Sequence, residues 1–99
     1  LSAADDTTIQ HLVSYVRHSG FEYRHGAERL DGRMLAHTLS REYAAIRGSV
    51  RSAEEFIERA AGASSSGANA LRARLPDGSE RSINELLRAE LGRYRTLRG

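Results

Sequence analysis

Two polar residues with a spacing that could support chemistry are His37 and Arg41. They are four positions apart in a segment with helical periodicity, so they would lie on the same face of a helix. A guanidinium carries five donors in a fixed plane, which suit a carboxylate or the carbonyl groups of a loop. This spacing allows two interpretations: a polar binding site, or an exposed polar edge beside the buried stripe of the same helix.

The run Ser64-Ser65-Ser66-Gly67 is the second feature that could support chemistry. A phosphate-binding loop would have the pattern GxxxxGK[ST] and would open a helix, whereas this run follows a predicted helix. A serine hydrolase elbow would have the pattern GxSxG, which does not occur. The sequence therefore favours loop hydroxyls that hydrogen-bond to nearby backbone groups.

Metal and cofactor chemistry find little support in the sequence. The chain has four histidines and no cysteine, which excludes disulfides, thiolate zinc sites and a cysteine nucleophile. The histidines are His11, His18, His25 and His37, and none belongs to an HExxH motif or to another tight ligand spacing. We expect neither a metal nor a cofactor.

All 15 basic residues are arginine, and the formal net charge is only +2. An arginine-rich chain without lysine suits an anion-binding protein, but it is also typical of a GC-rich genome. Glutamates are interleaved with the arginines, even in the basic C-terminal segment, where Glu85 and Glu90 accompany Arg88 and Arg93. Because a nucleic-acid interface requires a coherent basic patch with aromatic residues, nucleic acid is not the expected partner.

The positions of these residues depend on four amphipathic segments with apolar residues at helical spacing. The clearest stripe is Ile9, Leu12, Val13 and Val16, with candidate N-caps at residues 5–8 and a stop at Gly20. A second helix is predicted to begin near Asp31 and to end at residues 47–48. Capping boxes predict two more helices, one from Ser52 to Glu55 onward and one from Ser82 to Glu85 onward.

One β-hairpin is predicted between the last two helices. Residues 71–75 alternate between apolar residues and arginine, Pro76-Asp77-Gly78 is a turn sequence, and residues 79–81 form a short return strand. Residues 21–30 have no clear period and are interpreted as an ordered loop or a short extended segment. The predicted fold class is α+β, mostly α, as a single small domain over residues 1–99 with the order α-α-α-β-β-α and one β-hairpin. No apolar run is long enough to span a bilayer.

Several short motifs occur in a recognisable order along the chain. They are Arg24-His25-Gly26, the pair His37 and Arg41, Phe56-Ile57 followed by the serine run, Asp77-Gly78, and the closing segment 86–91. Over about residues 21–95 this pattern resembles the YfeK-like family of small exported bacterial proteins, a domain of unknown function. The resemblance implies a periplasmic or exported protein after removal of a signal peptide, and it implies no particular reaction.

The resemblance also suggests that the dispersed motif residues belong together. The candidate binding residues are Arg24, His37, Arg41, Ser64, Ser65, Ser66 and Gly67. We expect a non-enzymatic binding or accessory domain of the bacterial envelope whose partner is another protein. The alternative is a small anion-binding or hydrolytic enzyme that uses these same arginine, histidine and serine-loop residues.

Overall fold

The computed structural model describes residues 2–61 and 71–98, which form four helices and one four-stranded sheet. The first half contains α1 (Ala3–His18), β1 (Glu22–His25), β2 (Glu28–Leu30) and α2 (Gly32–Ile46). The second half contains α3 (Ala53–Ala61), β3 (Leu71–Arg74), β4 (Glu80–Ser82) and α4 (Ile83–Arg98). The predicted class, a small and mostly helical α+β domain, is confirmed.

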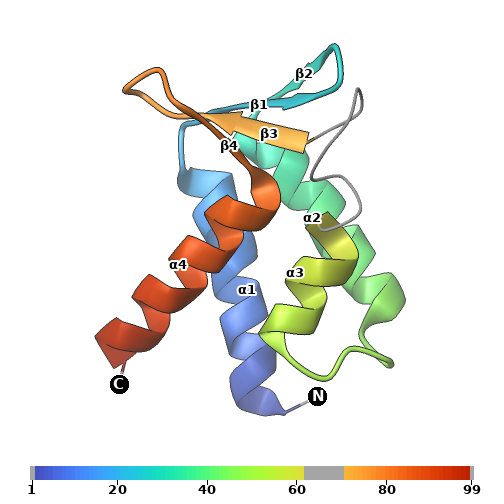
Figure 1. Cartoon of the computed structure of the whole chain (residues 1–99). Helices are drawn as coiled ribbons and strands as arrows, with labels where there is room; N and C mark the ends of the chain where they lie inside the picture. The colour runs from blue at the N-terminus through green and yellow to red at the C-terminus, as the bar shows by residue number, and fades with distance from the viewer. Residues whose placement is uncertain (1, 62–70, 99) are drawn as a thin grey trace.

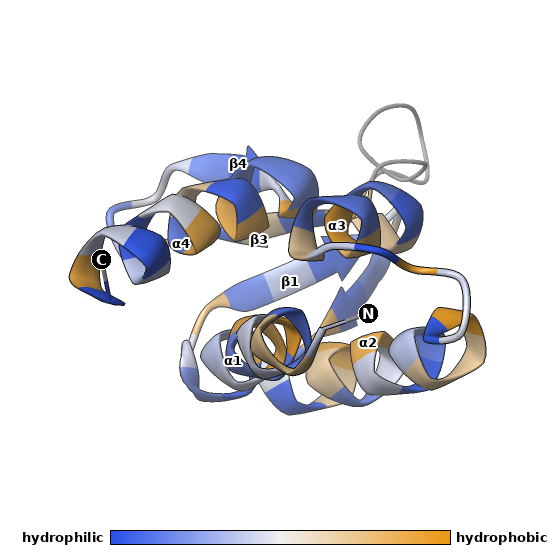
Figure 2. Cartoon of the chain, turned by 90° about the horizontal axis from the view of Figure 1, so that it is seen from below, coloured by the Kyte–Doolittle hydropathy of each residue, from blue (hydrophilic) through white to orange (hydrophobic). Residues whose placement is uncertain are grey.

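All neighbouring strands are antiparallel, and their spatial order is β2-β1-β3-β4. Tyr23 in the inner strand β1 is opposite Leu30 in β2 and Ala73 in β3, so these three side chains share one face of the sheet. The sheet crosses one end of the helices, and all four described helices lie on one side of it (Figure 1). Seen from below, α1 and α2 form one layer and α3 and α4 the other, with β1 visible between them (Figure 2).

The hairpin β1–β2 is absent from the predicted element order, which contained only the C-terminal hairpin. Residues 21–30 indeed contain an extended segment, but it pairs with a second strand through a two-residue turn at Gly26 and Ala27. Gly26 has φ 64°, the positive value that such a turn requires at its first central position. The strand was hard to see in the sequence because Tyr23 is its only fully buried residue.

Three helices start close to their predicted positions, and each has a side-chain N-cap. Asp31 accepts a hydrogen bond from the Met34 amide at 2.8 Å, and Ser52 and Ser82 accept from the third amide that follows each of them. The start predicted for the first helix is wrong by one turn, because Ser2 caps α1 by accepting from the amide of Asp5. Asp5 and Asp6 therefore lie in the first turn, where their negative charges interact favourably with the helix dipole.

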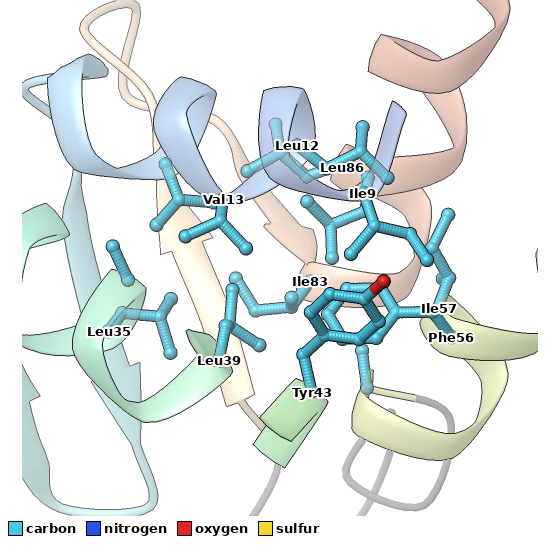
Figure 3. Packing of buried hydrophobic residues seen from close by; sticks show 14 of the residues in the cluster. Ile9, Leu12, Val13, Leu35, Leu39, Tyr43, Phe56, Ile57, Ile83 and Leu86 are labelled. Atoms are coloured by element: carbon cyan, nitrogen blue, oxygen red, sulfur yellow. The ribbon is translucent and has the colours of Figure 1, made fainter. Parts of the chain in front are cut away.

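The helices and the sheet share one core (Figure 3). The predicted stripe of α1 is buried, and the Tyr43 ring of α2 packs edge-on against Phe56 of α3, with ring centres 5.5 Å apart. In β3 the alternation is confirmed, since Leu71 and Ala73 are buried and Arg74 is exposed. The hairpin therefore packs on the helices through the predicted face of β3.

Candidate functional site

A depression lies where α2 meets the first hairpin and β3. Its cavity volume is about 220 Å³. Apolar side chains from four elements line it, together with polar groups from the hairpin turn and from α2. The lining residues are His25, Glu28, Leu30, Leu35, Thr38, Leu39, Glu42, Ala60 and Leu71. We refer to this site as the α2 depression.

A wider and shallower hollow of about 380 Å³ adjoins the α2 depression along the same helix. Thr38 and Glu42 line both, and Arg41 and Ala45 complete the second. These four residues occupy positions i, i+3, i+4 and i+7, so a single exposed face of α2 presents them all. Arg41 is thus a predicted site residue that lines a hollow of the described surface.

His37 and Arg24, two of the other predicted site residues, do not line either hollow. His37 is exposed on α2. Arg24 is exposed on β1, one residue from the inward-facing Tyr23, so its side chain is on the sheet face turned away from the helices. The predictions for Ser64, Ser65, Ser66 and Gly67, including that of an ordered loop, fall outside the described residues. The contact between this loop and the other site residues stays a prediction.

A polar cluster that sequence reasoning missed joins α1 to α4. Glu90 has a side chain that is only 2% exposed, and its carboxylate lies 2.6 Å from Nε2 of His11. Arg93 donates two hydrogen bonds of 2.7 Å to the same carboxylate, and the His11 ring stacks on Tyr94 at 4.0 Å. Burial by itself would raise the pKa of Glu90, but the hydrogen bonds from Arg93 and His11 outweigh it and hold that pKa below its usual value.

A signal for this cluster exists in the sequence. The apolar stripe of the last helix runs through Ile83, Leu87, Leu91 and Tyr94, and Glu90 lies four residues before Tyr94 on the same side of the helix. A carboxylate among buried leucines requires charged partners, since an isolated buried charge is very costly. The position of Glu90 on this side of the helix therefore indicates a charged partner, although the sequence does not identify that partner as His11.

Two further polar contacts connect neighbouring helices. The Tyr43 hydroxyl of α2 donates to Asp6 of α1 at 2.5 Å, and burial together with this carboxylate raises the pKa of Tyr43 to about 12. Arg95 of α4 donates two hydrogen bonds to Glu54 of α3, which lowers the pKa of Glu54 to about 2. In each case the charged or hydroxyl group holds two helices together.

The described residues contain no group of three or more histidine, aspartate or glutamate side chains placed to hold a metal ion. Over the same part of the chain, no helix is long and apolar enough to cross a membrane. Within the described surface, the α2 depression offers an apolar hollow with polar groups at its edge, and several arginines are exposed.

These features define a small, mostly helical α+β domain in which several polar contacts connect neighbouring helices. A family model matches residues 3–95, and the chain belongs to that family, DUF5329, a family of unknown function. There is no match among curated proteins and none among solved structures.

Proposed function

We propose that this chain is a non-enzymatic binding or accessory domain of the bacterial envelope, and that it holds an apolar side chain of another protein in the α2 depression. The observation that carries the proposal is the depression itself. Leucines from α2, β2 and β3 form its apolar part, while His25, Glu28 and Glu42 supply polar groups. An apolar pocket with a few polar groups is the usual composition of a recognition site.

The size of the α2 depression favours a protein partner over a small-molecule substrate. Pockets for drug-sized ligands generally measure about 300–1,000 Å³. At about 220 Å³, the α2 depression is smaller than that range and suits a single anchoring side chain. One or a few buried anchors often supply most of the binding energy at protein interfaces. The adjoining hollow beside Arg41 and Glu42 could then accept polar neighbours of the anchor.

Assignment to the envelope rests on the resemblance to the exported YfeK-like proteins. It is tested by fractionating the bacterium that makes the natural protein. We expect recovery in the periplasmic or secreted fraction, and recovery in the cytoplasm would contradict the assignment.

The binding role is tested by obstructing the α2 depression without disturbing the core. Thr38→Trp places a large ring at a residue that lines both hollows, whereas Ala44→Trp places the same ring on an exposed part of α2 that lines neither. Random displayed peptides are selected on the unmodified domain, and envelope proteins are captured with all three forms. We expect the selected peptides to share a leucine, isoleucine, methionine or phenylalanine anchor.

The two variants then separate the possible results. Peptides and captured proteins that bind the unmodified domain and Ala44→Trp, but not Thr38→Trp, would support the proposal. Equal binding to all three forms would place recognition elsewhere on the domain. Failure to select any peptide or to retain any envelope protein would refute a protein-binding role for this site.

A further inference from the structure

The face of the sheet turned away from the helices carries a row of three arginines. Arg24 in β1 is directly opposite Arg29 in β2 and directly opposite Arg72 in β3. Arg24 and Arg29 are exposed, and the Arg72 side chain is 43% exposed. All four described helices lie on the other side of the sheet (Figure 1), so none of them covers this row. We refer to these three residues as the arginine row.

Such a row is expected to destabilise the sheet. Like charges directly opposite each other on neighbouring strands are destabilising. The adjacent row is different, since Arg74 lies between Glu22 and Glu80 and the charges alternate. Those two glutamates also reach the outer members of the arginine row, with Glu22 at 3.3 Å from Arg29 and Glu80 at 3.6 Å from Arg72.

Arg24, at the centre, has no ion pair within the described residues. The two rows together contain four arginines and two glutamates, so this one face carries a net charge of +2, equal to the formal net charge of the whole chain. The face therefore has an unbalanced positive charge that is available to an anionic partner.

We propose that the arginine row binds the phosphate groups of an anionic lipid surface. Guanidinium groups match phosphate oxygens in both geometry and charge. Adjacent strands are about 4.8 Å apart, so the row extends over roughly 10 Å and is wider than one phosphate. A flat array of this width suits several headgroups of a surface better than it suits a single small anion.

The composition of the face argues against the other polyanions. Its residues at the paired positions are Glu22, Arg24, Arg29, Arg72, Arg74, Glu80 and Ser82. None of these is aromatic, whereas single-stranded nucleic acids bind on aromatic stacking platforms. None is apolar, whereas the centre of a protein interface is usually depleted of charge and rich in apolar groups. Attraction to an anionic membrane requires only basic residues near the surface.

The test uses vesicles of phosphatidylglycerol mixed with phosphatidylcholine, and vesicles of phosphatidylcholine alone, at low salt. Arg24→Gln/Arg72→Gln removes two members of the arginine row. The control Arg51→Gln/Arg98→Gln removes the same charge from two exposed positions. One lies in the connection between α2 and α3 and the other at the end of α4, both remote from the sheet (Figure 1).

The unmodified domain should sediment with the anionic vesicles only, and added salt should release it. Arg24→Gln/Arg72→Gln should bind roughly thirty-fold more weakly, because each basic residue at such a surface strengthens binding on the order of fivefold. The control should stay within a few-fold of the unmodified domain. Thermal unfolding checks the fold, and the row variant should melt at an equal or higher temperature because like-charge opposition is relieved.

Absence of binding to anionic vesicles would overturn the proposal, as would equal losses in the two double variants. Tighter binding to a single-stranded oligonucleotide than to vesicles would overturn it in favour of nucleic acid. Complete release by millimolar inorganic phosphate at constant ionic strength would overturn it in favour of a small-anion site. None of these outcomes depends on the α2 depression.

Discussion

His11 and Glu90 are 79 residues apart in the chain, yet Nε2 of His11 lies 2.6 Å from Oε2 of Glu90. The contact joins the middle of α1 to the middle of α4, and Arg93 and the Tyr94 ring complete it. Because the Glu90 carboxylate is almost fully buried, this polar cluster helps to determine how the first and last helices pack.

Glu90→Gln should lower the free energy of unfolding by about 1.5–3 kcal/mol, the usual range for hydrogen bonds to charged groups. The substitution keeps the size of the side chain but removes the negative charge of the carboxylate, which both His11 and Arg93 contact. Urea unfolding measures the change. Glu58→Gln is the matched control, because Glu58 pairs with Arg88 at the exposed surface and should contribute less than about 1 kcal/mol. Equal losses for the two variants would show that the buried cluster has no special role.

Stability should fall in acid partly through Glu54. Its hydrogen bonds from Arg95 lower its pKa from 4.5 to about 2 in the folded protein. The stabilisation is therefore present above pH 4.5 and is lost as the pH falls toward 2. Thermal unfolding of Glu54→Gln and of the unmodified domain should differ at pH 7 and converge near pH 2. Arg95→Gln, which removes the partner, should behave in the same way. A difference that stays constant with pH would contradict this assignment, and high salt should reduce it because the pair is exposed.

Two glycine substitutions should have opposite effects. A Cβ built on Gly32, at the start of α2, would collide with the backbone carbonyl of Val16 in α1. Gly32→Ala should therefore destabilise the domain by about 1–3 kcal/mol, as overpacking does. Gly92 is an exposed position within α4 with nothing near its Cβ, so Gly92→Ala should stabilise by about 0.5–1 kcal/mol through helix propensity. Chemical denaturation of both variants tests this, and a neutral Gly32→Ala would show that α1 and α2 can separate at low cost.

The two sides of β3 should respond differently to truncation. Leu71 faces the core, and Leu71→Ala should cost about 2–4 kcal/mol. Arg72 faces away from the helices, and Arg72→Ala should change stability by no more than about 0.5 kcal/mol. The comparison uses urea midpoints at matched pH and salt. Similar losses from the two variants would mean that the strand face is assigned wrongly.

The elements that depend on local chemistry were predictable from the sequence. Apolar residues at helical spacing identified all four helices, and Ser52, Ser82 and Asp31 marked three of their starts because a capping side chain bonds to an amide only three residues away. The alternation in β3 and the turn around Gly78 were visible for the same reason. The first hairpin was not visible, because a four-residue strand with one buried side chain leaves almost no periodic signal.

Which distant residues meet depends on how the helices and strands pack together. The arginine row exists because the register of three strands aligns Arg24, Arg29 and Arg72, and no spacing in the sequence states that register. The pairing of His11 with Glu90 likewise depends on how α1 packs against α4. Local sequence patterns specify which face of a helix or strand is buried. The residue that contacts this face from another element depends on the packing of the whole core, and a short stretch of sequence does not contain that information.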